Sequence, residues 1–435
     1  MKNKFLVVLP LLFITQFSQA QELLTLKDAV SQALENNYNI RLVKKQVEIA
    51  KNNNTYGNAG FFPNVILQGG DENSSSNVYQ KYYDGRIKDQ KGANANSLTG
   101  SILLNWTIFQ GFDMFIAKNG LNAQEDFQQL QAQMTVENTV ASVISLYYGI
   151  VAEKLKANVM KNALALSGQR KKLSVYKLRL GMASKTDLYQ SEVDYNADTA
   201  AYIQQKNTLL SMKTSLNTLL ARSLDTDFKV ADTLIISSEL QLANVLDSVN
   251  AQNTQLSLAR LNTDIAGLNL KYWKNQYYPA ISIYGGYNYV KSTSQAGLLE
   301  SNRNYGPVIG VSGSMTLFNG LANSRNIKNA QIQVQASKLE QEKTHLEMED
   351  LVYRQYLNYA TNVNLAKLEK NNLSSAKGNL DIAIEKFKLG AIDNLQLRDI
   401  QVKYIQAQNR FYQAIYQVKV GETELLRLSG NLNQI

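Results

Sequence analysis

The residues able to do chemistry in this chain are few. Its 435 residues include one histidine, His345, and no cysteine. The lack of cysteine excludes disulfides, thiolate metal sites and a nucleophilic thiol. His345 lies in the polar helical stretch "EKTHLEMED", which is typical of a solvated helix residue rather than a catalytic base. Carboxylates remain, but no pair of them differs from ordinary charge on helix faces. The sequence therefore predicts no enzyme, no cofactor and no metal site.

The net charge of +9 raises the question of a nucleic-acid partner. Clustered Lys and Arg side chains would neutralise phosphates, but here the basic residues are spread along helical segments and mixed with Asp and Glu. The sequence also has no Walker-type phosphate loop. We therefore expect neither nucleic-acid binding nor nucleotide hydrolysis.

Residues 1–20 have the pattern of a cleaved secretory signal. Lys2 and Lys4 precede an apolar run at 5–17, and Ala20 ends a small-residue cleavage site. The run is shorter than the ~20 residues that span a bilayer, and no later apolar stretch is long enough. We expect an exported protein, which would have to use β-strands if it enters a membrane.

Most of the chain is duplicated. Gly181 in "RLGMAS" and Gly390 in "KLGAID" are 209 residues apart, and so are Gly111 in "WTIFQG" and Gly320 in "MTLFNG". A period of this length indicates two copies of a large unit rather than a solenoid of short repeats. Each copy is predicted to contain a helix, two strands, a very long helix, a tip and a long helix.

The copies differ in length near their strands. The spacing from Pro63 in "GFFPNV" to Pro279 in "QYYPAI" exceeds that of the glycine pairs by seven, so the first copy has seven extra residues before its Phe-x-Gly motif. An insertion at this place predicts a surface loop. The predicted organisation is a signal at 1–20, a first repeat at 21–221 with a β-hairpin at about 62–108 and a tip at 180–187, a linker at 222–253 with a small side structure, a second repeat at 254–430 with a β-hairpin at about 279–318 and a tip at 389–396, and a tail at 431–435.

The predicted strands have two chemically different faces. Leu98, Ile102, Leu104, Trp106 and Ile108 share one face and Ser101, Asn105 and Thr107 the other, and the second copy places Ile309, Val311, Met315 and Leu317 against Ser312, Ser314 and Thr316. This alternation fits a transmembrane strand, and it also fits a half-buried strand of a soluble sheet. The many nearby tyrosines favour the membrane, because aromatic side chains suit the bilayer interface. The polar segments at 71–96 and 291–304 are predicted loops. Four strands are too few to close a barrel, so several protomers would have to share one.

The segment from 112 to 180 is predicted to be one very long helix. It has no proline and an apolar series in alternating steps of three and four, at Phe127, Leu130, Met134, Ala141, Ile144, Tyr148, Val151 and Leu155, with Glu137 as a polar member. Such a helix would reach about 100 Å. The pattern fits a hollow helical tube, and a solid coiled-coil rod remains the alternative.

Each Leu-Gly tip reads as a helix end followed by a helix start. Gly181 can take the left-handed conformation, with Met182 positioned for the hydrophobic contact that often follows it. Ser184 and Asp187 have the spacing of a capping box. The second tip has the same arrangement in Gly390, Ala391, Asp393 and Gln396. Both are predicted to be tight αα-hairpins.

The duplicated architecture, the "FQG" and "FNG" strand exits and both tips together resemble the TolC-like outer membrane efflux proteins of Gram-negative bacteria. The resemblance covers nearly the whole mature chain. It implies an α+β membrane protein that forms a homotrimer, in which each protomer gives four strands to one 12-stranded barrel in outer membrane lipid. An α-helical barrel would continue through the periplasm. A periplasmic adaptor (membrane fusion) protein and an inner-membrane transporter are the implied partners, for passive conduction in efflux or type I secretion.

The resemblance also implies roles for particular residues. The candidates for adaptor docking are Arg179, Leu180, Gly181, Ser184, Lys388, Leu389, Gly390 and Asp393. The acidic entrance positions of the family fall on Gln396 and Asp399, so one carboxylate is missing and weaker cation binding is expected. Asp187 matches the acceptor of the family's closing contacts, but Phe387 and Ile392 occupy the donor positions. We therefore do not expect that lock to form. An exported coiled-coil scaffold or adhesin without a pore is the alternative function.

Overall fold

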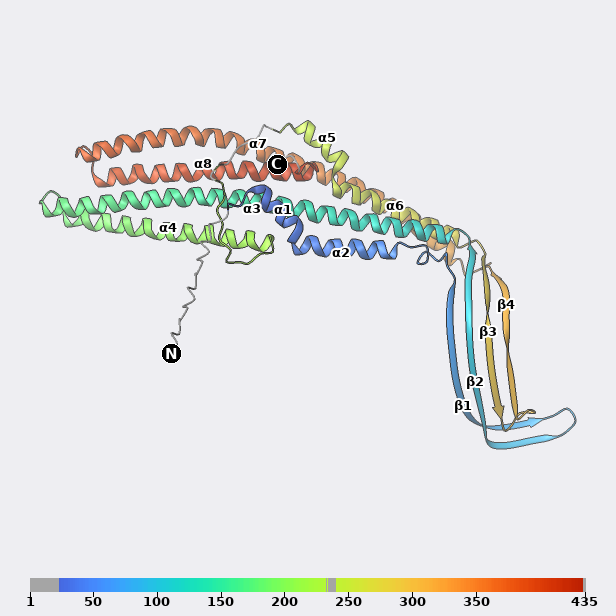
Figure 1. Cartoon of the computed structure of the whole chain (residues 1–435). Coiled ribbons are helices and arrows are strands. Elements are labelled where there is room, and N and C mark those ends of the chain that lie inside the picture. The colour runs from blue at the N-terminus through green and yellow to red at the C-terminus, as the bar shows by residue number, and fades with distance from the viewer. Residues whose placement is uncertain (1–22, 232, 234–239, 433–435) are drawn as a thin grey trace, which may run out of the picture. The chain divides into compact units, whose positions relative to one another are not determined.

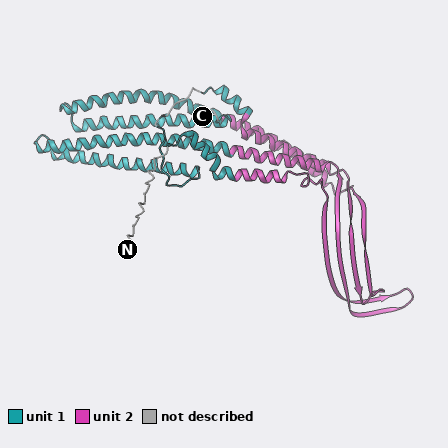
Figure 2. Cartoon of the chain, viewed as in Figure 1, with its two compact units in different colours: residues 1–41, 135–251, 351–435 teal, residues 42–134, 252–350 magenta. Residues whose placement is uncertain are grey.

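The computed structural model describes residues 23–231, 233 and 240–432. The predicted signal and the last three residues of the predicted tail lie outside them. The chain divides into two compact units: unit 1 contains 1–41, 135–251 and 351–435, and unit 2 contains 42–134 and 252–350 (Figure 2). Each unit collects segments from both sequence copies, so the compact units cut across the repeats.

The duplication is visible in the helices. Helices α3 (Asp113–Arg179) and α7 (Ala322–Lys388) both have 67 residues, and α4 (Lys185–Leu219) and α8 (Asn394–Leu428) both have 35 (Figure 1). The starts within each pair have the same spacing as Gly181 and Gly390. Structure and sequence therefore give the same register for these four helices.

The shorter helices follow the other spacing. α1 (Leu26–Asn36) and α5 (Leu242–Gln252) both have 11 residues, and α2 (Tyr38–Asn53) and α6 (Thr254–Asn275) have 16 and 22. The starts within each of these pairs have the same spacing as Pro63 and Pro279. The seven extra residues therefore lie in the segment between Pro63 and Gly111 and not in these helices.

The apolar series in α3 is buried as predicted. Ala141, Ile144 and Val151 are buried, and the other apolar members are half-buried. In unit 1 the main core also includes Leu24, Leu216 and Phe228. The described part of the linker contributes to this core, because Phe228 follows α4 and Leu23 pairs with Lys229 in an isolated bridge. The predicted side structure thus contains this bridge and α5, with residues 232 and 234–239 outside the described chain.

Unit 2 contains one antiparallel sheet in the order β1-β2-β3-β4. The strands are β1 (Asn64–Lys81), β2 (Ile87–Gln110), β3 (Ala280–Ser294) and β4 (Ser301–Ser314). Within the described chain, no helix is both long enough and apolar enough to cross a membrane.

The predicted loop at 71–96 was wrong. β1 continues to Lys81 and β2 begins at Ile87, so this polar segment is mostly paired strand. Polarity suggested a loop, and Asn is indeed uncommon in strands, but pairing of the backbone with the neighbouring strand outweighs this weak preference. The predicted loop at 291–304 likewise shrinks to the six residues between Ser294 and Ser301. The extra residues of the first copy lengthen a β-hairpin rather than form a loop.

The predicted end of the last strand was also wrong. β4 stops at Ser314, so Met315, Thr316 and Leu317 are not part of it. Ser314 pairs with Ala280, which directly follows Pro279. Proline has no backbone N–H to donate, so the pairing of β3 with β4 ends there. In β2, Ile108 lies at the register shift between Thr107 and Phe109 and leaves the regular alternation.

The two faces of the sheet are otherwise as predicted. Leu104 of β2 aligns with Gly285 and Ile309, and Ile102 aligns with Leu67 and Tyr287, so apolar side chains of all four strands share one face. Ser101, Asn105 and Thr107 point to the opposite face, because successive residues alternate.

Candidate functional site

Both tips of unit 1 end their long helices in the same way. Gly181 has φ +72° and Gly390 has φ +74°. The N–H of Gly181 donates to the carbonyl of Leu178 and that of Met182 donates to Lys177, at 3.0 and 2.8 Å. The second tip repeats both bonds, from Gly390 to Phe387 and from Ala391 to Lys386. This is the Schellman motif, and it satisfies carbonyls that the helix end leaves unpaired.

Met182, the residue expected to make a hydrophobic contact here, is 72% exposed. Its neighbour Leu180 is 73% exposed, and Leu389 of the second tip is 83% exposed. Both tips therefore present apolar side chains outward, which is a feature of surfaces that contact other molecules.

Capping boxes start the return helices, as predicted. The Ser184 hydroxyl accepts from the Asp187 N–H at 3.2 Å, and the Ser184 N–H donates to the Asp187 carboxylate at 2.9 Å. These backbone and hydroxyl hydrogen bonds lower the pKa of Asp187. At the second tip Asp393 accepts from the Gln396 N–H at 2.7 Å. Asp187 and Gln396 therefore have a local structural task at the start of each helix.

Below the tips, a buried charge cluster joins the two helix hairpins. Arg170 of α3 donates to Asp194 of α4 at 2.8 Å, within the first hairpin. It also donates to Asn394 and Gln401 of α8 at 2.9 and 3.1 Å, across to the second hairpin. Arg170 is thus the centre of a network that includes three helices.

A second arginine also joins the two hairpins, but it belongs to the second hairpin and binds a residue of the first. Arg398 of α8 makes two hydrogen bonds of 2.8 Å to the two carboxylate oxygens of Asp198 on α4. Burial tends to lower the pKa of Arg398, but the hydrogen bonds and charge of Asp198 leave it raised. Such bidentate pairs are strong and directional. The hairpins are thus held together by two arginines.

Apolar contacts between the two hairpins lie next to this charge cluster, on the side of the tips. Phe387 and Leu397 are buried in a cluster of the second hairpin, with Ile392 and Leu173 of α3 packed against it. The ammonium of Lys177 lies 4.9 Å from the centre of the Phe387 ring. Phe387 and Ile392, which cannot make the family's polar lock, are therefore part of an apolar junction instead.

The remaining predicted residues are on the surface. Asp399 pairs with Lys403 at 2.7 Å, and Lys388 pairs with Glu385 at 2.6 Å, all with exposed side chains. His345 is also exposed, with Nδ1 3.9 Å from Glu349. In the described ranges, no group of three or more His, Cys, Asp or Glu side chains is placed to hold a metal ion.

Sequence reasoning missed both arginines and their aspartates. A signal was present, since Asp194 and Asp198 are four residues apart and therefore share one face of α4. Charge on a helix face usually means solvent, and only the packing of the second hairpin shows that this face is covered.

The strand exit of the first copy is a second site that the sequence showed only in part. Gly111 has φ +57°, and the side chain of Asn275 lies against it. Asn275 accepts from the Phe112 N–H at 2.9 Å and donates to the Gln110 carbonyl at 3.0 Å and to Asp113 at 2.5 Å. The buried amide thus fixes the turn from β2 into α3.

The fold is that of outer membrane channels. The chain resembles the crystal structure of the CmeC outer membrane channel of Campylobacter jejuni, with a TM-score of 0.77 at 12% identity over 94% of this chain and 86% of that one. The outer membrane protein VceC of Vibrio cholerae gives 0.73 at 13% identity over 93% and 96%. The predicted fold class is therefore confirmed.

The second copy of the chain matches the outer membrane efflux protein family. Residues 245–431 match the family model described as outer membrane efflux protein. The outer membrane protein TolC of Vibrio cholerae is 19% identical over 416 residues, which is 94% of this chain and 91% of that protein. The resemblance read from the sequence is confirmed, and the protein is an outer membrane exit channel that extends into the periplasm.

Proposed function

We propose that this protein is the exit duct of a tripartite efflux or type I secretion system. It conducts substrates passively from an inner-membrane transporter and its periplasmic adaptor to the outside. The observation that carries the proposal is the pair of matched tips, built on helices of equal length in a chain whose second copy matches the efflux protein family model. Two matching helix ends with outward apolar side chains suit contact with a partner.

The unpaired sheet edges support a homotrimer. β1 pairs only with β2 and β4 only with β3 among the described strands. An open edge presents unpaired N–H and carbonyl groups, which are costly in lipid. Pairing of β4 of one protomer with β1 of the next removes every edge, and three protomers supply 12 strands for a closed barrel.

Apolar stripes on two helices support the same assembly. Ile332, Leu339, Leu346 and Tyr353 recur every seven residues along α7 and are all exposed. On α4, Tyr189, Val193, Ile203 and Leu210 form a similar exposed series. A seven-residue apolar repeat packs against another helix in a supercoil. A neighbouring copy is the partner that we assign to both stripes.

The tips are the proposed adaptor surface. Its members from the first tip are Arg179, Leu180, Gly181 and Ser184, and those from the second are Lys388, Leu389, Gly390 and Asp393. The glycines and caps fix the backbone, while Leu180 and Leu389 supply exposed apolar contact area. Arg179 and Lys388 add charged groups at the rim of this surface.

The entrance is proposed to bind cations weakly. Asp187 is engaged in its capping box, Gln396 is uncharged, and Asp399 is paired with Lys403. A ring of these residues around a pore would therefore hold little free negative charge. The closed state is held by the Arg170 and Arg398 cluster together with the Phe387 junction, in place of the family's polar lock.

Single-channel recording tests the proposal. The full-length protein is expressed, outer membranes are isolated, and the purified assembly is placed in a planar bilayer. We expect heat-resistant trimers that conduct ions. A photocrosslinking residue at position 185, the first residue of α4 at the first tip, should crosslink to a periplasmic adaptor. A soluble product without conductance would instead support the alternative function, an exported coiled-coil scaffold or adhesin.

A further inference from the structure

One face of the sheet changes chemistry in steps, from the helices toward the far ends of the strands. The register aligns side chains in rows across all four strands, and rows two residues apart share a face. The first two such rows are Val65–Leu104–Gly285–Ile309 and Leu67–Ile102–Tyr287–Pro307. Both rows lack charge, as a face toward lipid acyl chains must.

An aromatic pair follows on the same face. The next row has glycines on β1 and β2, and it places Tyr289 of β3 directly opposite Tyr305 of β4. The two rings are stacked, with their centres 6.4 Å apart and their planes at 27°. Tyrosine has an apolar ring and a polar hydroxyl, so this row marks the boundary between acyl chains and headgroups.

Two cations stand directly beyond the tyrosines. In the next row Lys291 is opposite Arg303. Like charges in this position repel, which destabilises the sheet unless an anion lies between them. Within the described chain, neither side chain forms an ion pair or a hydrogen bond. Asp71 is in the same row, but Leu98 of β2 separates it from Lys291, and its carboxylate accepts from Asn96.

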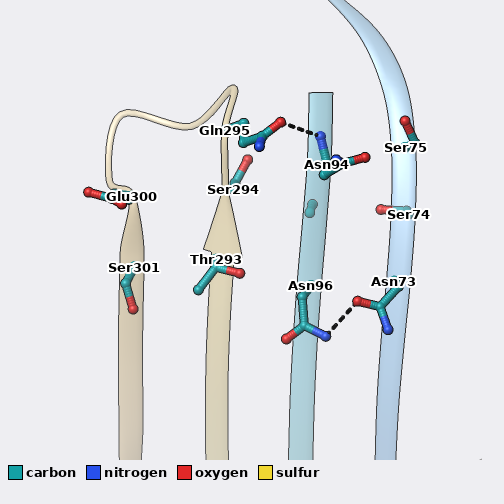
Figure 3. A pocket seen from close by; sticks show the side chains of 11 residues that line it. Asn73, Ser74, Ser75, Asn94, Asn96, Thr293, Ser294, Gln295, Glu300 and Ser301 are labelled. Atoms are coloured by element: carbon teal, nitrogen blue, oxygen red, sulfur yellow. Dashed lines mark hydrogen bonds between the residues drawn. The ribbon is translucent and has the colours of Figure 1, made fainter. Parts of the chain in front are cut away.

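The last row is rich in amide and hydroxyl groups. Asn73, Asn96, Thr293 and Ser301 lie at one level across the four strands and line a cavity of about 540 Å³ (Figure 3). Asn96 donates to the Asn73 side chain at 2.8 Å, so other donors and acceptors of the row remain available. Such groups suit the hydroxyls of sugars.

We propose that Lys291 and Arg303 bind the phosphate of a glycolipid headgroup in the outer leaflet of the outer membrane. The acyl chains lie on the apolar rows, the phosphate lies between the two cations, and the sugar hydroxyls meet the row of Asn73 and Asn96. A free phosphate would use the cations but leave the order of the other rows unexplained. The site lies in the sheet and does not depend on the conduit function assigned to the tips.

Lipid binding by the purified full-length protein tests the site. The protein is stripped of lipid in detergent and titrated with phosphorylated lipid A or dephosphorylated lipid A, with bound lipid measured by native mass spectrometry. We expect Lys291→Gln/Arg303→Gln to weaken lipid A binding about 10- to 30-fold, since each basic residue near an anionic membrane surface contributes about 1 kcal/mol, which is about a fivefold factor. The phosphate-free lipid should bind the wild type as weakly as lipid A binds this variant.

The matched control is Lys81→Gln/Lys91→Gln. It also removes two exposed cations, but from the other hairpin, which is formed by β1 and β2. It should bind lipid A like the wild type, and Lys291→Arg should do so as well. Unchanged binding in the double variant at 291 and 303 would overturn the proposal, and so would equal binding of the phosphate-free lipid. Competition by inorganic phosphate at the concentration at which lipid A binds would show a general anion site and overturn the lipid assignment. Far-UV circular dichroism and heat-dependent gel mobility verify the fold of each variant.

Discussion

Arg170 of α3 and Asp194 of α4 form an ion pair of 2.8 Å, and 3% and 9% of their side chains are exposed. Burial lowers the pKa of Arg170, and the hydrogen bond and charge of Asp194 oppose that shift. The pair therefore depends on its neighbours, Asn394 and Gln401 of the second hairpin, which complete the hydrogen bonds of the guanidinium.

Removing one partner of this pair should be costly. Asp194→Leu leaves Arg170 as a buried, uncompensated charge, which costs about 3–5 kcal/mol. We expect a clear drop in the melting temperature of the purified protein, followed by circular dichroism. The double variant Arg170→Leu/Asp194→Leu should recover part of the lost melting temperature, because it leaves no unpaired buried charge.

The exposed pair of Asp399 and Lys403 provides the control, because surface ion pairs contribute about 0–1 kcal/mol. Asp399→Ala should leave the melting temperature almost unchanged. Equal losses for Asp194→Leu and Asp399→Ala would show that the cluster is not an important contact between the hairpins.

Each tip requires its glycine for the backbone. Gly181→Val or Gly390→Val forces a β-branched residue into a left-handed conformation, which costs an L-residue about 1–2 kcal/mol or more. We expect the variants to reach the outer membrane but to lose crosslinking of position 185 to the adaptor. Gly378→Ala is the control, since Gly378 lies within α7 in open space. Full adaptor crosslinking by both valine variants would show that the tips are not the docking surface.

Substitutions at the two strand exits distinguish the effect of backbone strain from the effect of a side-chain contact. Gly111 and Gly320 have φ +57° and +63°, but only at Gly111 would a Cβ lie 2.5 Å from Asn275. Both Ala substitutions strain the backbone, and only Gly111→Ala also displaces the Asn275 amide. At about 1 kcal/mol per hydrogen bond, it should lower the melting temperature much more than Gly320→Ala. Equal effects would mean that Asn275 adapts without cost.

The two faces of β4 should respond differently to charge. Ile309 belongs to the apolar face, so Ile309→Arg should cost about 2–4 kcal/mol at mid-membrane and reduce the folded protein in outer membrane fractions. Ser312 belongs to the opposite face, and Ser312→Arg should insert like the wild type while changing the single-channel conductance. The reverse result would exchange the lipid and lumen faces.

Sequence patterns predicted the features that depend on local rules. The seven-residue apolar spacing predicted the long helix α3. Gly181 and Ser184 predicted the hairpin turn, because a left-handed glycine and an N-cap act within a few residues. The register shared by Gly181 and Gly390 predicted α7 from α3, since two copies of one segment fold alike.

The contacts that the sequence did not predict join segments that are far apart in the chain. Arg170 and Gln401 are 231 residues apart, and nothing near either residue indicates the other. The polar strands at 71–96 were missed for a related reason, because pairing with a neighbouring strand stabilised a segment whose composition suggested a loop. Asn275 is specific to one copy, since Ala59 stands at the matching position of the first copy in the register that aligns Pro63 with Pro279.

The equal lengths of α3 and α7 constrain how the chain can change. Each residue adds about 1.5 Å and a rotation of about 100° to an α-helix. A deletion in α3 alone would shift Arg170 along and around its axis, away from Asn394 and Gln401. We therefore expect insertions and deletions in α3 and α7 to be tolerated only in matched pairs, one in each helix, and in steps that restore the facing side of both helices. The distance that this protein spans is thus set twice in one gene, and neither copy can be changed without the other.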